Sequence, residues 1–137
     1  MKNNRKLSFL FISLLVFTFV IINLKWSKGF DDINKCLVKY KYEWGKAGSL
    51  CKESSKSYSV YFRNECYKKI DAKCAVQETD NRWKTFTRLN MGYNDTLCGY
   101  ACSGTGKYLV YVKSTTDKSI ILPSDDEIQI LGNPSQK

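Results

Sequence analysis

The sequence predicts a small all-β domain, an antiparallel sandwich or barrel stabilised by disulfides and preceded by an N-terminal hydrophobic targeting or anchor segment. Three observations predict this class. The six cysteines, an even number, all follow the hydrophobic segment, as in small exported domains. Short runs alternate apolar and polar residues, and turn signals separate them about every 8 to 12 residues. The chain lacks the regular alternation of strands and helices that is typical of a parallel sheet.

We divide the chain into four parts. A signal peptide or membrane anchor occupies 1–29, a lysine- and aromatic-rich lead-in 30–56, the β core 57–113, and a C-terminal strand or tail 114–137. A chain of 137 residues has room for one hydrophobic core, since domains cluster near about 100 to 150 residues.

The first part has the charge pattern of a targeting segment. Residues 2–6 carry three positive charges, and an uncharged run of 18 residues follows, from Leu7 to Leu24. This run is longer than the usual signal-peptide core of about 7 to 15 residues. It is also close to the lower limit of about 17 residues for a membrane-spanning helix, so its length allows both interpretations.

The residues after the run support both alternatives. Ser27 and Gly29 have the small-x-small arrangement that favours cleavage before Phe30. Lysines on either side of Trp26 instead favour an uncleaved anchor at a membrane interface. In either case we expect residues 30–137 to lie outside the cytoplasm, secreted or periplasmic, or tethered to a membrane through residues 7–24.

The lead-in mixes lysines with aromatic residues. This pattern predicts a short strand around 37–42 and a loop that returns to Cys51. Cys36 stands directly before that strand. A disulfide between Cys36 and Cys51 would therefore close the loop.

The β core opens with the two clearest alternating runs. In residues 57–63 and again in residues 70–77 the even-numbered positions are apolar or aromatic and share one face. The polar segment 64–69 connects them. We therefore expect the two runs to form an antiparallel hairpin.

Two further strands complete the predicted core. Turn signals at 78–81 and 90–95 flank an alternating run at 83–89, and the last strand is 107–113. The remaining residues, 114–137, are mostly polar and fit either a closing strand or a loose tail. No convincing amphipathic helix is predicted after the leader.

The cysteine pattern favours disulfides over a metal site. No spacing is Cys-x-x-Cys and the chain contains no histidine, so a zinc site is not expected. We expect no other cofactor. The predicted disulfide framework uses Cys36, Cys51, Cys66, Cys74, Cys98 and Cys102.

The charge balance is moderately basic. The full chain has a formal net charge of +9, and without the five basic residues of 1–29 there remain 17 basic and 13 acidic residues, a net charge of +4. A solvated surface explains this balance. Clustered lysines in 35–56 are the only support for attraction to anionic lipid, glycan or cell wall. Nucleic acid is not an expected partner of an exported protein.

The absence of histidine excludes serine and cysteine hydrolases that use a histidine base. The stretch Gly104 to Lys107 resembles a phosphate-binding loop only in part, because Ala101 stands where the first glycine belongs and Tyr108 where Ser or Thr belongs. We therefore predict no nucleotide. A glycoside hydrolase remains an alternative, with candidate carboxylates at Glu65, Asp71, Glu78, Asp80 and Asp95.

A binding role is the main prediction, directed at an unknown protein or glycan outside the cytoplasm. Exposed aromatic and basic side chains on the same strand face suit such recognition, although the same aromatics could pack inside the core. The segment 103–107 is expected to form a presented turn. The candidate contact residues are Tyr61, Lys84, Phe86, Ser103, Gly104, Lys107 and Tyr111.

Several short motifs share an order with a known family. They are Asn64-Glu65-Cys66, Ile70 to Cys74, Trp83, Leu89 to Gly92, and Ala101 to Tyr108. Over residues 58–113 the chain resembles a family of small secreted bacterial β domains of undefined function. Thr85 stands where that family has a cysteine, and Met91 where it has a proline.

The family resemblance implies an extracytoplasmic accessory or binding module and carries over no catalytic residue. It favours Cys74–Cys98 and Cys66–Cys102 as disulfides, with Cys66–Cys74 as the main rival. Six cysteines allow 15 pairings, and the sequence does not choose among them.

A second resemblance concerns the loop before the last strand. Ser103-Gly104 followed by Tyr108 is similar, with one extra residue, to the Ser-Gly-x-x-Tyr loop of periplasmic lysozyme inhibitors. This resemblance implies an inhibitor that inserts the loop into the lysozyme cleft. A net charge of +4 opposes it, since commonly basic lysozymes would be repelled.

Overall fold

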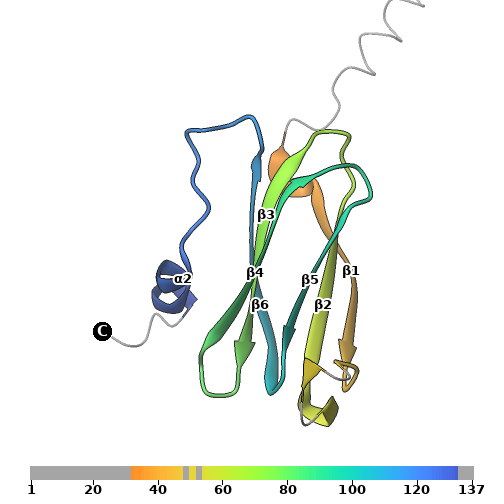
Figure 1. The fold of residues 1–137 in the computed structure, drawn as a ribbon, viewed down its shortest axis with the longest axis vertical. Helices are drawn as coiled ribbons and strands as arrows, with labels where there is room; N and C mark the ends of the chain where they lie inside the picture. The colour runs from red at the N-terminus through yellow and green to blue at the C-terminus, as the bar shows by residue number, and fades with distance from the viewer. Residues whose placement is uncertain (1–31, 48–49, 52–53, 133–137) are drawn as a thin grey trace, which may run out of the picture. The chain divides into compact units, whose positions relative to one another are not determined.

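The computed structural model describes residues 32–47, 50–51 and 54–132, so the leader 1–29 lies outside the described residues. Within them the chain forms six strands in two three-stranded antiparallel sheets, with one short α-helix (Figure 1). The predicted all-β class is thus confirmed at the level of a mostly β domain. None of the described helices is long and apolar enough to cross a membrane.

The first sheet has the order β1-β2-β5 and the second the order β4-β3-β6. Two 3₁₀ turns, η1 (Ile33–Lys35) and η3 (Ser54–Lys56), precede β1 and β2. The strands are β1 (Leu37–Trp44), β2 (Tyr58–Asn64), β3 (Ile70–Glu78), β4 (Trp83–Met91), β5 (Thr96–Ala101) and β6 (Gly104–Ser114).

The main core lies between the two sheets. Val60 and Phe62 of β2 are buried with Ala72, Cys74 and Val76 of β3, each at most 2% exposed. These are the even-numbered faces that the alternation predicts. Full burial of a large apolar side chain contributes about 1.5 to 3 kcal/mol, so this layer supplies most of the driving force for sheet stacking.

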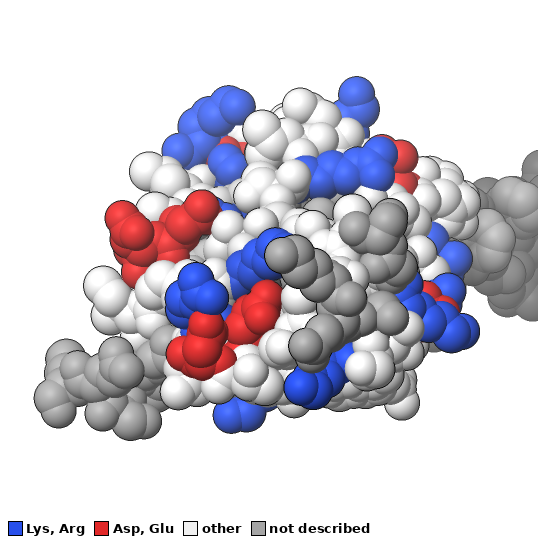
Figure 2. All heavy atoms as spheres, turned by 60° about the horizontal axis from the view of Figure 1, so that its bottom comes forward, with Lys and Arg blue, Asp and Glu red and all other residues white. Residues whose placement is uncertain are grey.

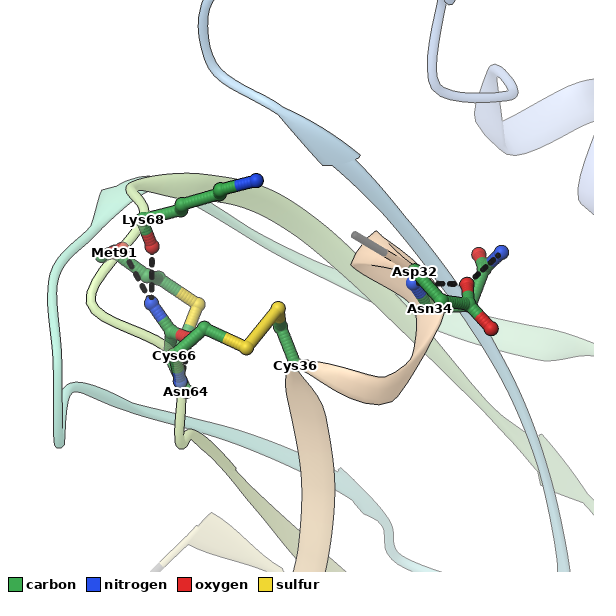
Figure 3. The surroundings of a disulfide bond; sticks show 7 residues. All are labelled: Asp32, Asn34, Cys36, Asn64, Cys66, Lys68 and Met91. Atoms are coloured by element: carbon green, nitrogen blue, oxygen red, sulfur yellow. Dashed lines mark hydrogen bonds between the residues drawn. A yellow bond between two sulfur atoms is a disulfide. The ribbon is translucent and has the colours of Figure 1, made fainter. Parts of the chain in front are cut away.

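The expected hairpin between residues 57–63 and 70–77 is wrong. β2 pairs with β1 and β5, whereas β3 pairs with β4 and β6, so their connection crosses from one sheet to the other. Buried Asn64 holds this crossing: its Nδ2 donates to the carbonyls of Lys68 and Met91, both at 2.9 Å (Figure 3). Its Oδ1 accepts the Cys66 amide hydrogen at 3.0 Å.

Strand β5 was not predicted because its sequence lacks an apolar alternation. Gly99 faces the opposite sheet, where a Cβ would lie 2.7 Å from Cys74 Sγ and 2.9 Å from Val76 Cγ2. The sheets approach too closely here for any side chain. The position is occupied by glycine for a packing reason that a single sequence does not reveal.

Part of the C-terminal segment forms a helix, α2 (Asp125–Gly132), so neither the closing strand nor the loose tail describes residues 125–132. Ser124 caps it: its Oγ accepts the Glu127 amide hydrogen at 3.2 Å, and the Ser124 amide donates to Glu127 Oε2 at 2.7 Å. This is a capping box, a helix-start signal present in the sequence. Three acidic residues in the first turn stabilise the helix further, because their negative charges interact favourably with the positive end of the helix dipole.

Helix α2 lies beside the β4-β3-β6 sheet, on the side away from the β1-β2-β5 sheet (Figure 1). Ile128 is fully buried in a second cluster with Ala75 and Trp83. The outer face of β3 is therefore covered. Lys73, only 8% exposed, donates to the Pro123 carbonyl at 2.8 Å and pairs with Asp125 at 2.6 Å.

The structure contains disulfides Cys36–Cys66 and Cys51–Cys102. The expected Cys36–Cys51 and Cys66–Cys102 pairings are wrong. Cys36 stands before β1 and Cys66 after β2, and the pairing of Leu37 with Asn64 brings these two ends together. Two disulfides indicate an oxidising environment outside the cytoplasm.

Cys74 and Cys98 are free thiols, so the expected Cys74–Cys98 disulfide is also wrong. Cys74 points into the core opposite Gly99. Cys98 is the neighbour of Gly99 on β5 and is exposed, because successive side chains of a strand point to opposite faces. The two sulfurs therefore lie on different faces of the β1-β2-β5 sheet.

Candidate functional site

Tyr61, the first predicted contact residue, lies on the outer face of the β1-β2-β5 sheet. Its hydroxyl donates to Glu43 Oε2 at 3.2 Å, and the Lys41 ammonium lies 5.1 Å from its ring centroid. Burial, then the nearby Cys98 and Glu43, raises the pKa of Tyr61 to about 12. Lys41, followed by Lys46, lowers the pKa of Glu43. Opposite charges on this face therefore neutralise one another.

Phe86 and Lys84 lie on the side of β4 that meets β5. The Phe86 ring centroid is 5.0 Å from that of Tyr100, and the Lys84 ammonium lies 4.0 Å from the Tyr100 ring centroid. A Cβ at Gly99 would be 3.3 Å from Phe86. Phe86 thus packs between the sheets, as the core-packing alternative expected.

Tyr111 lies on the opposite face of the β4-β3-β6 sheet. It packs half-buried against the cluster of Ala75, Trp83 and Ile128 beneath α2. The structure therefore places Tyr61, Phe86 and Tyr111 at three separate positions. They do not form the single aromatic and basic surface that the strand patterns suggested.

Residues 102–103 connect β5 to β6 and so join the two sheets rather than two strands of one sheet, whereas residues 104–107, expected in a presented turn, are the first residues of β6. Glu78 accepts the amide hydrogens of Cys102 and Ser103, both at 3.2 Å. The Thr79 amide donates to the Ser103 carbonyl at 2.8 Å. With Cys102 bonded to Cys51, the loop is held in place from both sides.

Glycine is required at positions 104 and 106 for two different structural reasons. A Cβ on Gly104 would lie 2.5 Å from the Cβ of Tyr58, so close packing excludes a side chain there. Gly106 has φ +81°, a left-handed conformation that favours glycine. Lys107, at the next position, is exposed. The glycines therefore serve packing and backbone geometry.

The strongest candidate for a binding site is a surface along the edge strand β1, which sequence reasoning missed. A register shift between Lys39 and Lys41 moves Tyr42 and Trp44 onto the inward-pointing face of the strand. Both residues remain exposed, at 59% and 48%, because β1 is the edge of its sheet. We name this the β1 aromatic surface, formed by Lys39, Tyr42, Trp44, Tyr58 and Tyr108.

Buried rings support the exposed ones. Trp44 and Tyr42 lie 4.8 Å and 6.3 Å from Tyr58, measured between ring centroids. Tyr58 itself is 4% exposed. A Cβ on Gly106 would lie 3.1 Å from Trp44 Cζ2, so the absence of a side chain there gives the indole its place.

Lys39 lies among these rings. Its ammonium is 5.1 Å from the Tyr108 ring centroid and 5.6 Å from that of Tyr42. A hydrogen bond that Lys39 donates to the Tyr108 side chain, followed by the electrostatic effect of Tyr108, raises the pKa of Lys39 above its ordinary value. Lys39 forms no ion pair with any described residue. The β1 aromatic surface thus offers exposed rings and one cation that has no acidic partner among the residues that the structure describes.

Elsewhere, charges of both signs are mixed. Figure 2 shows Lys and Arg side chains next to Asp and Glu side chains across the described part of the face it presents. No large region of one sign is visible there. Electrostatic attraction over this face is therefore weaker than the net charge alone suggests.

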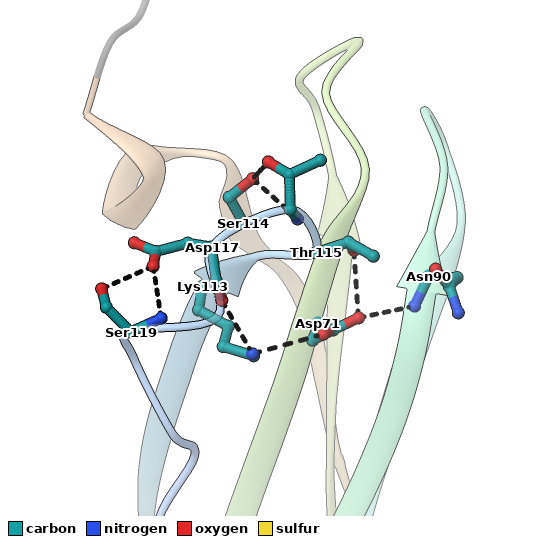
Figure 4. A network of polar contacts seen from close by, with 8 residues as sticks. Asp71, Asn90, Lys113, Ser114, Thr115, Asp117 and Ser119 are labelled. Carbon is teal, nitrogen blue, oxygen red and sulfur yellow. Dashed lines mark hydrogen bonds and ion pairs between the residues drawn. The ribbon is translucent and has the colours of Figure 1, made fainter.

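Buried Asp71 is the most connected of the five candidate carboxylates. Its Oδ1 accepts the Asn90 amide hydrogen at 2.9 Å and the Thr115 hydroxyl hydrogen at 3.0 Å, and Lys113 lies 3.8 Å away (Figure 4). These bonds join β3, β4 and the end of β6. Asp71 is therefore engaged in fixing strand ends.

The other four carboxylates each have their own partners. Glu65 pairs with Arg63, Asp80 with Arg82 and Asp95 with Arg88, at 2.7, 2.6 and 3.2 Å. Glu78 is held by the two amides of the β5–β6 loop. In the described part of the chain, no group of three or more His, Cys, Asp or Glu side chains could hold a metal ion.

A pocket beside α2 is a weaker candidate. Its lining is Glu78, Arg82, Trp83, Lys84 and Gln129. The Gln129 side chain accepts from the Trp83 amide at 2.9 Å and donates to the Trp83 carbonyl at 2.6 Å. Arg82 is paired with an aspartate, and Lys84 lies over a tyrosine ring. Most polar groups of this pocket are thus already engaged.

Comparison with known proteins finds no matching family model, no matching curated protein and no matching solved structure. The resemblance of residues 58–113 to small secreted bacterial domains therefore stays a prediction. The candidate site depends on the geometry described above.

Proposed function

We propose that this chain is a non-enzymatic module that acts outside the cytoplasm and binds a protein or glycan through the β1 aromatic surface. The single observation that carries this proposal is the exposure of Tyr42 and Trp44, at 59% and 48%, on a face whose inner residues are buried. Large exposed rings that sit on a rigid support are typical of recognition surfaces.

The chemistry of the surface fits either class of ligand. Flat rings can stack on the apolar face of a sugar or on the side chains of a protein. The Lys39 ammonium, which has no described acidic partner, can donate to carboxylate or hydroxyl oxygens. Because Tyr58 and Tyr108 hold the surface in place, little ordering of side chains would be needed on binding.

The non-enzymatic part of the proposal is supported by the carboxylates. Glycoside hydrolases need two carboxyl groups flanking one bond, about 5 to 9.5 Å apart. Here the five candidate acids are tied to five different sets of donors. A reducing-sugar assay of the purified chain on polysaccharides tests this directly, and sustained turnover would contradict the proposal.

Binding is tested by passing the full chain over immobilised peptidoglycan, chitin and mannan, and over immobilised proteins of the cell envelope. We compare the parent with Tyr42→Ser/Trp44→Ser. The matched control is Tyr40→Ser, which removes a ring of similar exposure, 44%, from the other face of the same strand. Retention that depends on Tyr42 and Trp44 but not on Tyr40 supports the proposal.

The lysozyme-inhibitor alternative also keeps a direct test. The Ser103 loop is held firmly by Glu78 and by the Cys51–Cys102 disulfide, as a presented loop requires. Lysozyme activity is measured with the parent chain and with Ser103→Ala. If the parent chain does not inhibit lysozyme, this alternative is excluded.

A further inference from the structure

The β1 aromatic surface combines exposed rings with a single charged group, the ammonium of Lys39. This ammonium lies 5.1 Å from the ring centroid of Tyr108 and 5.6 Å from that of Tyr42. It donates a hydrogen bond to the Tyr108 side chain. Because a lysine ammonium has three hydrogens to donate, it can still donate to a ligand that lies against the exposed rings.

The domain does not neutralise this charge within the part of the chain that the structure describes. Glu43, the acidic residue of β1, lies on the opposite face of the strand. There Lys41 and Lys46 approach its carboxylate oxygens to 3.1 and 3.3 Å. The raised pKa of Lys39 keeps its ammonium charged throughout the neutral pH range. The β1 aromatic surface is therefore locally positive.

The side chains around Lys39 fit a sugar better than a protein. The other four members of the surface are aromatic, and none is aliphatic. Each ring has a hydrogen-bonding group at its edge, a hydroxyl on the tyrosines and an N–H on Trp44. Lysine is depleted at protein interfaces, whereas here a lysine lies among the rings. Flat rings with polar edges instead match a saccharide, which has apolar C–H faces and a rim of hydroxyl groups.

The two exposed rings follow each other along the strand. Tyr42 and Trp44 are alternate residues of β1, about 7 Å apart along the strand, or two steps of its repeat. Both are tilted against buried Tyr58, by 36° and 52°, so neither lies flat on it. Since both rings are also about half exposed, they can contact successive units of a chain of sugars.

We propose that the ligand of the β1 aromatic surface is an acidic polysaccharide, whose sugar rings stack on Tyr42 and Trp44 while one of its carboxylates pairs with Lys39. This inference rests on the proposed function and narrows its class of ligand. A sugar stacked on Tyr42 displaces water from the neighbouring ammonium, and a desolvated charge without a partner costs free energy. A carboxylate on the ligand offsets this cost through a charge-assisted hydrogen bond, which a neutral sugar does not offer.

The test measures binding of the full chain to immobilised polygalacturonate and alginate, each beside the same polymer with its carboxylates esterified. The ester keeps the sugar rings and linkages and removes only the charge. Lys39→Met removes the ammonium but keeps an unbranched side chain, and Lys39→Arg restores the charge.

Lys107→Met is the matched control for the change in net charge. Lys107 is an exposed lysine of β6 that forms no ion pair with a described residue. It follows Gly106 and precedes Tyr108, which both face Trp44 and Lys39. Because successive side chains of a strand alternate, Lys107 belongs to the other face of its sheet.

We expect the parent to bind the acidic polymers about tenfold or more tightly than their esters, as a hydrogen bond between charged groups allows. Lys39→Met should abolish this preference, Lys39→Arg should keep most of it, and Lys107→Met should leave it unchanged. Tyr42→Ser/Trp44→Ser should weaken binding to the acidic polymers, although the net charge is the same as in the parent.

Equal binding of the parent to the acidic and esterified polymers, or binding to neither, would overturn this inference. A preference that survives in Lys39→Met would do the same. Full binding of the acidic polymers by Tyr42→Ser/Trp44→Ser would also overturn it, because the net positive charge alone would then explain the attraction. The proposed function fails separately, if retention on chitin, mannan or envelope proteins does not depend on Tyr42 and Trp44.

Discussion

The Trp44 ring packs against Tyr58 at a tilt of 52° with 4.8 Å between ring centroids, yet Trp44 is 48% exposed and Tyr58 only 4%. One ring of the pair belongs to the core and the other to the surface. The buried tyrosine acts as a platform that positions the indole. This relationship separates the residue that supports the fold from the residue available to a ligand.

The different burial of Trp44 and Tyr58 predicts that alanine substitutions at the two positions destabilise the fold by different amounts. Tyr58→Ala should lower the free energy of unfolding by about 3 to 5 kcal/mol, the range for large aromatic core residues. Trp44→Ala should cost about 1.5 kcal/mol or less, since it loses mainly one aromatic contact. Urea denaturation measures both. Equal costs would show that Trp44 is a core residue rather than part of a binding surface.

The close approach at Gly99 predicts overpacking. Gly99→Ala places a methyl group against Cys74 Sγ and Val76, which should destabilise the domain by about 1 to 3 kcal/mol. In a Cys74→Ala background the same change should cost less, because the sulfur is gone. A double-mutant cycle by urea denaturation measures the coupling. Additive effects of the two substitutions would mean that they do not touch.

The free thiols predict a two-stage labelling pattern. In the native protein an alkylating reagent should modify Cys98 alone, and Cys74 only after unfolding. Partial burial of its sulfur raises the pKa of Cys98 above the usual value, so its alkylation should accelerate at a higher pH than that of an unperturbed thiol. Burial raises the pKa of Cys74 to about 12. Mass mapping of labelled peptides under non-reducing conditions measures both; native labelling of Cys74 would contradict the core placement.

The same mapping identifies the disulfides. It should recover linked peptides for Cys36–Cys66 and Cys51–Cys102. Removing the first as Cys36→Ser/Cys66→Ser should cost about 2 to 4 kcal/mol, because the unfolded chain gains freedom. Recovery of a Cys74–Cys98 peptide from native protein would contradict the structure.

The Lys73–Asp125 pair predicts a pH-dependent contribution from α2. Lys73, followed by Thr85, lowers the pKa of Asp125, so the pair stabilises the fold above the ordinary aspartate pKa of about 3.9 and loses this effect as pH falls through the lowered value. Asp125→Asn should cost about 1 kcal/mol or less at neutral pH, since Asp125 is 68% exposed. The difference in free energy of unfolding between Asp125→Asn and the parent should vanish in acid, where Asp125 is protonated.

The neighbouring carboxylate provides the control for this prediction. Asp126→Asn removes the same charge from the same helix turn without touching Lys73. Urea denaturation between neutral and acidic pH compares the two variants. If Asp126→Asn reproduces the effect, the charge of the helix N-terminus rather than the pair with Lys73 is responsible.

Five of the six strands follow from the sequence: four lie in runs where apolar and polar residue types alternate, and β1 lies in the lysine- and aromatic-rich lead-in. Sheet assignment does not follow, since the crossing after β2 depends on the hydrogen bonds of Asn64, a single buried polar residue. β5 has no apolar alternation, because Gly99 stands at an inward-facing position where side chains of the other sheet leave no room for an apolar side chain. The capping box of Ser124 and Glu127 indicates the start of helix α2. The helix buries only one residue, Ile128, so its sequence shows no amphipathic period.

The candidate site was harder to predict than the fold. The run from Lys39 to Trp44 alternates charged and aromatic residues, and without further information neither face is apolar. The register shift between Lys39 and Lys41 decides which rings point inward, and only the pairing of β1 with β2 reveals it. The disulfides were mispaired for a similar reason, since they connect strand ends that are distant in the sequence.

The measurement that tests the central claim most directly is the affinity ratio between Tyr42→Ser/Trp44→Ser and Tyr40→Ser for the ligand retained by the parent chain. The three tyrosine and tryptophan positions lie on one strand and have similar exposure. We predict a loss of about tenfold or more for the double variant, as for residues that dominate an interface, and little change for Tyr40→Ser. Equal losses, or no loss in the double variant, would contradict a binding role for the β1 aromatic surface.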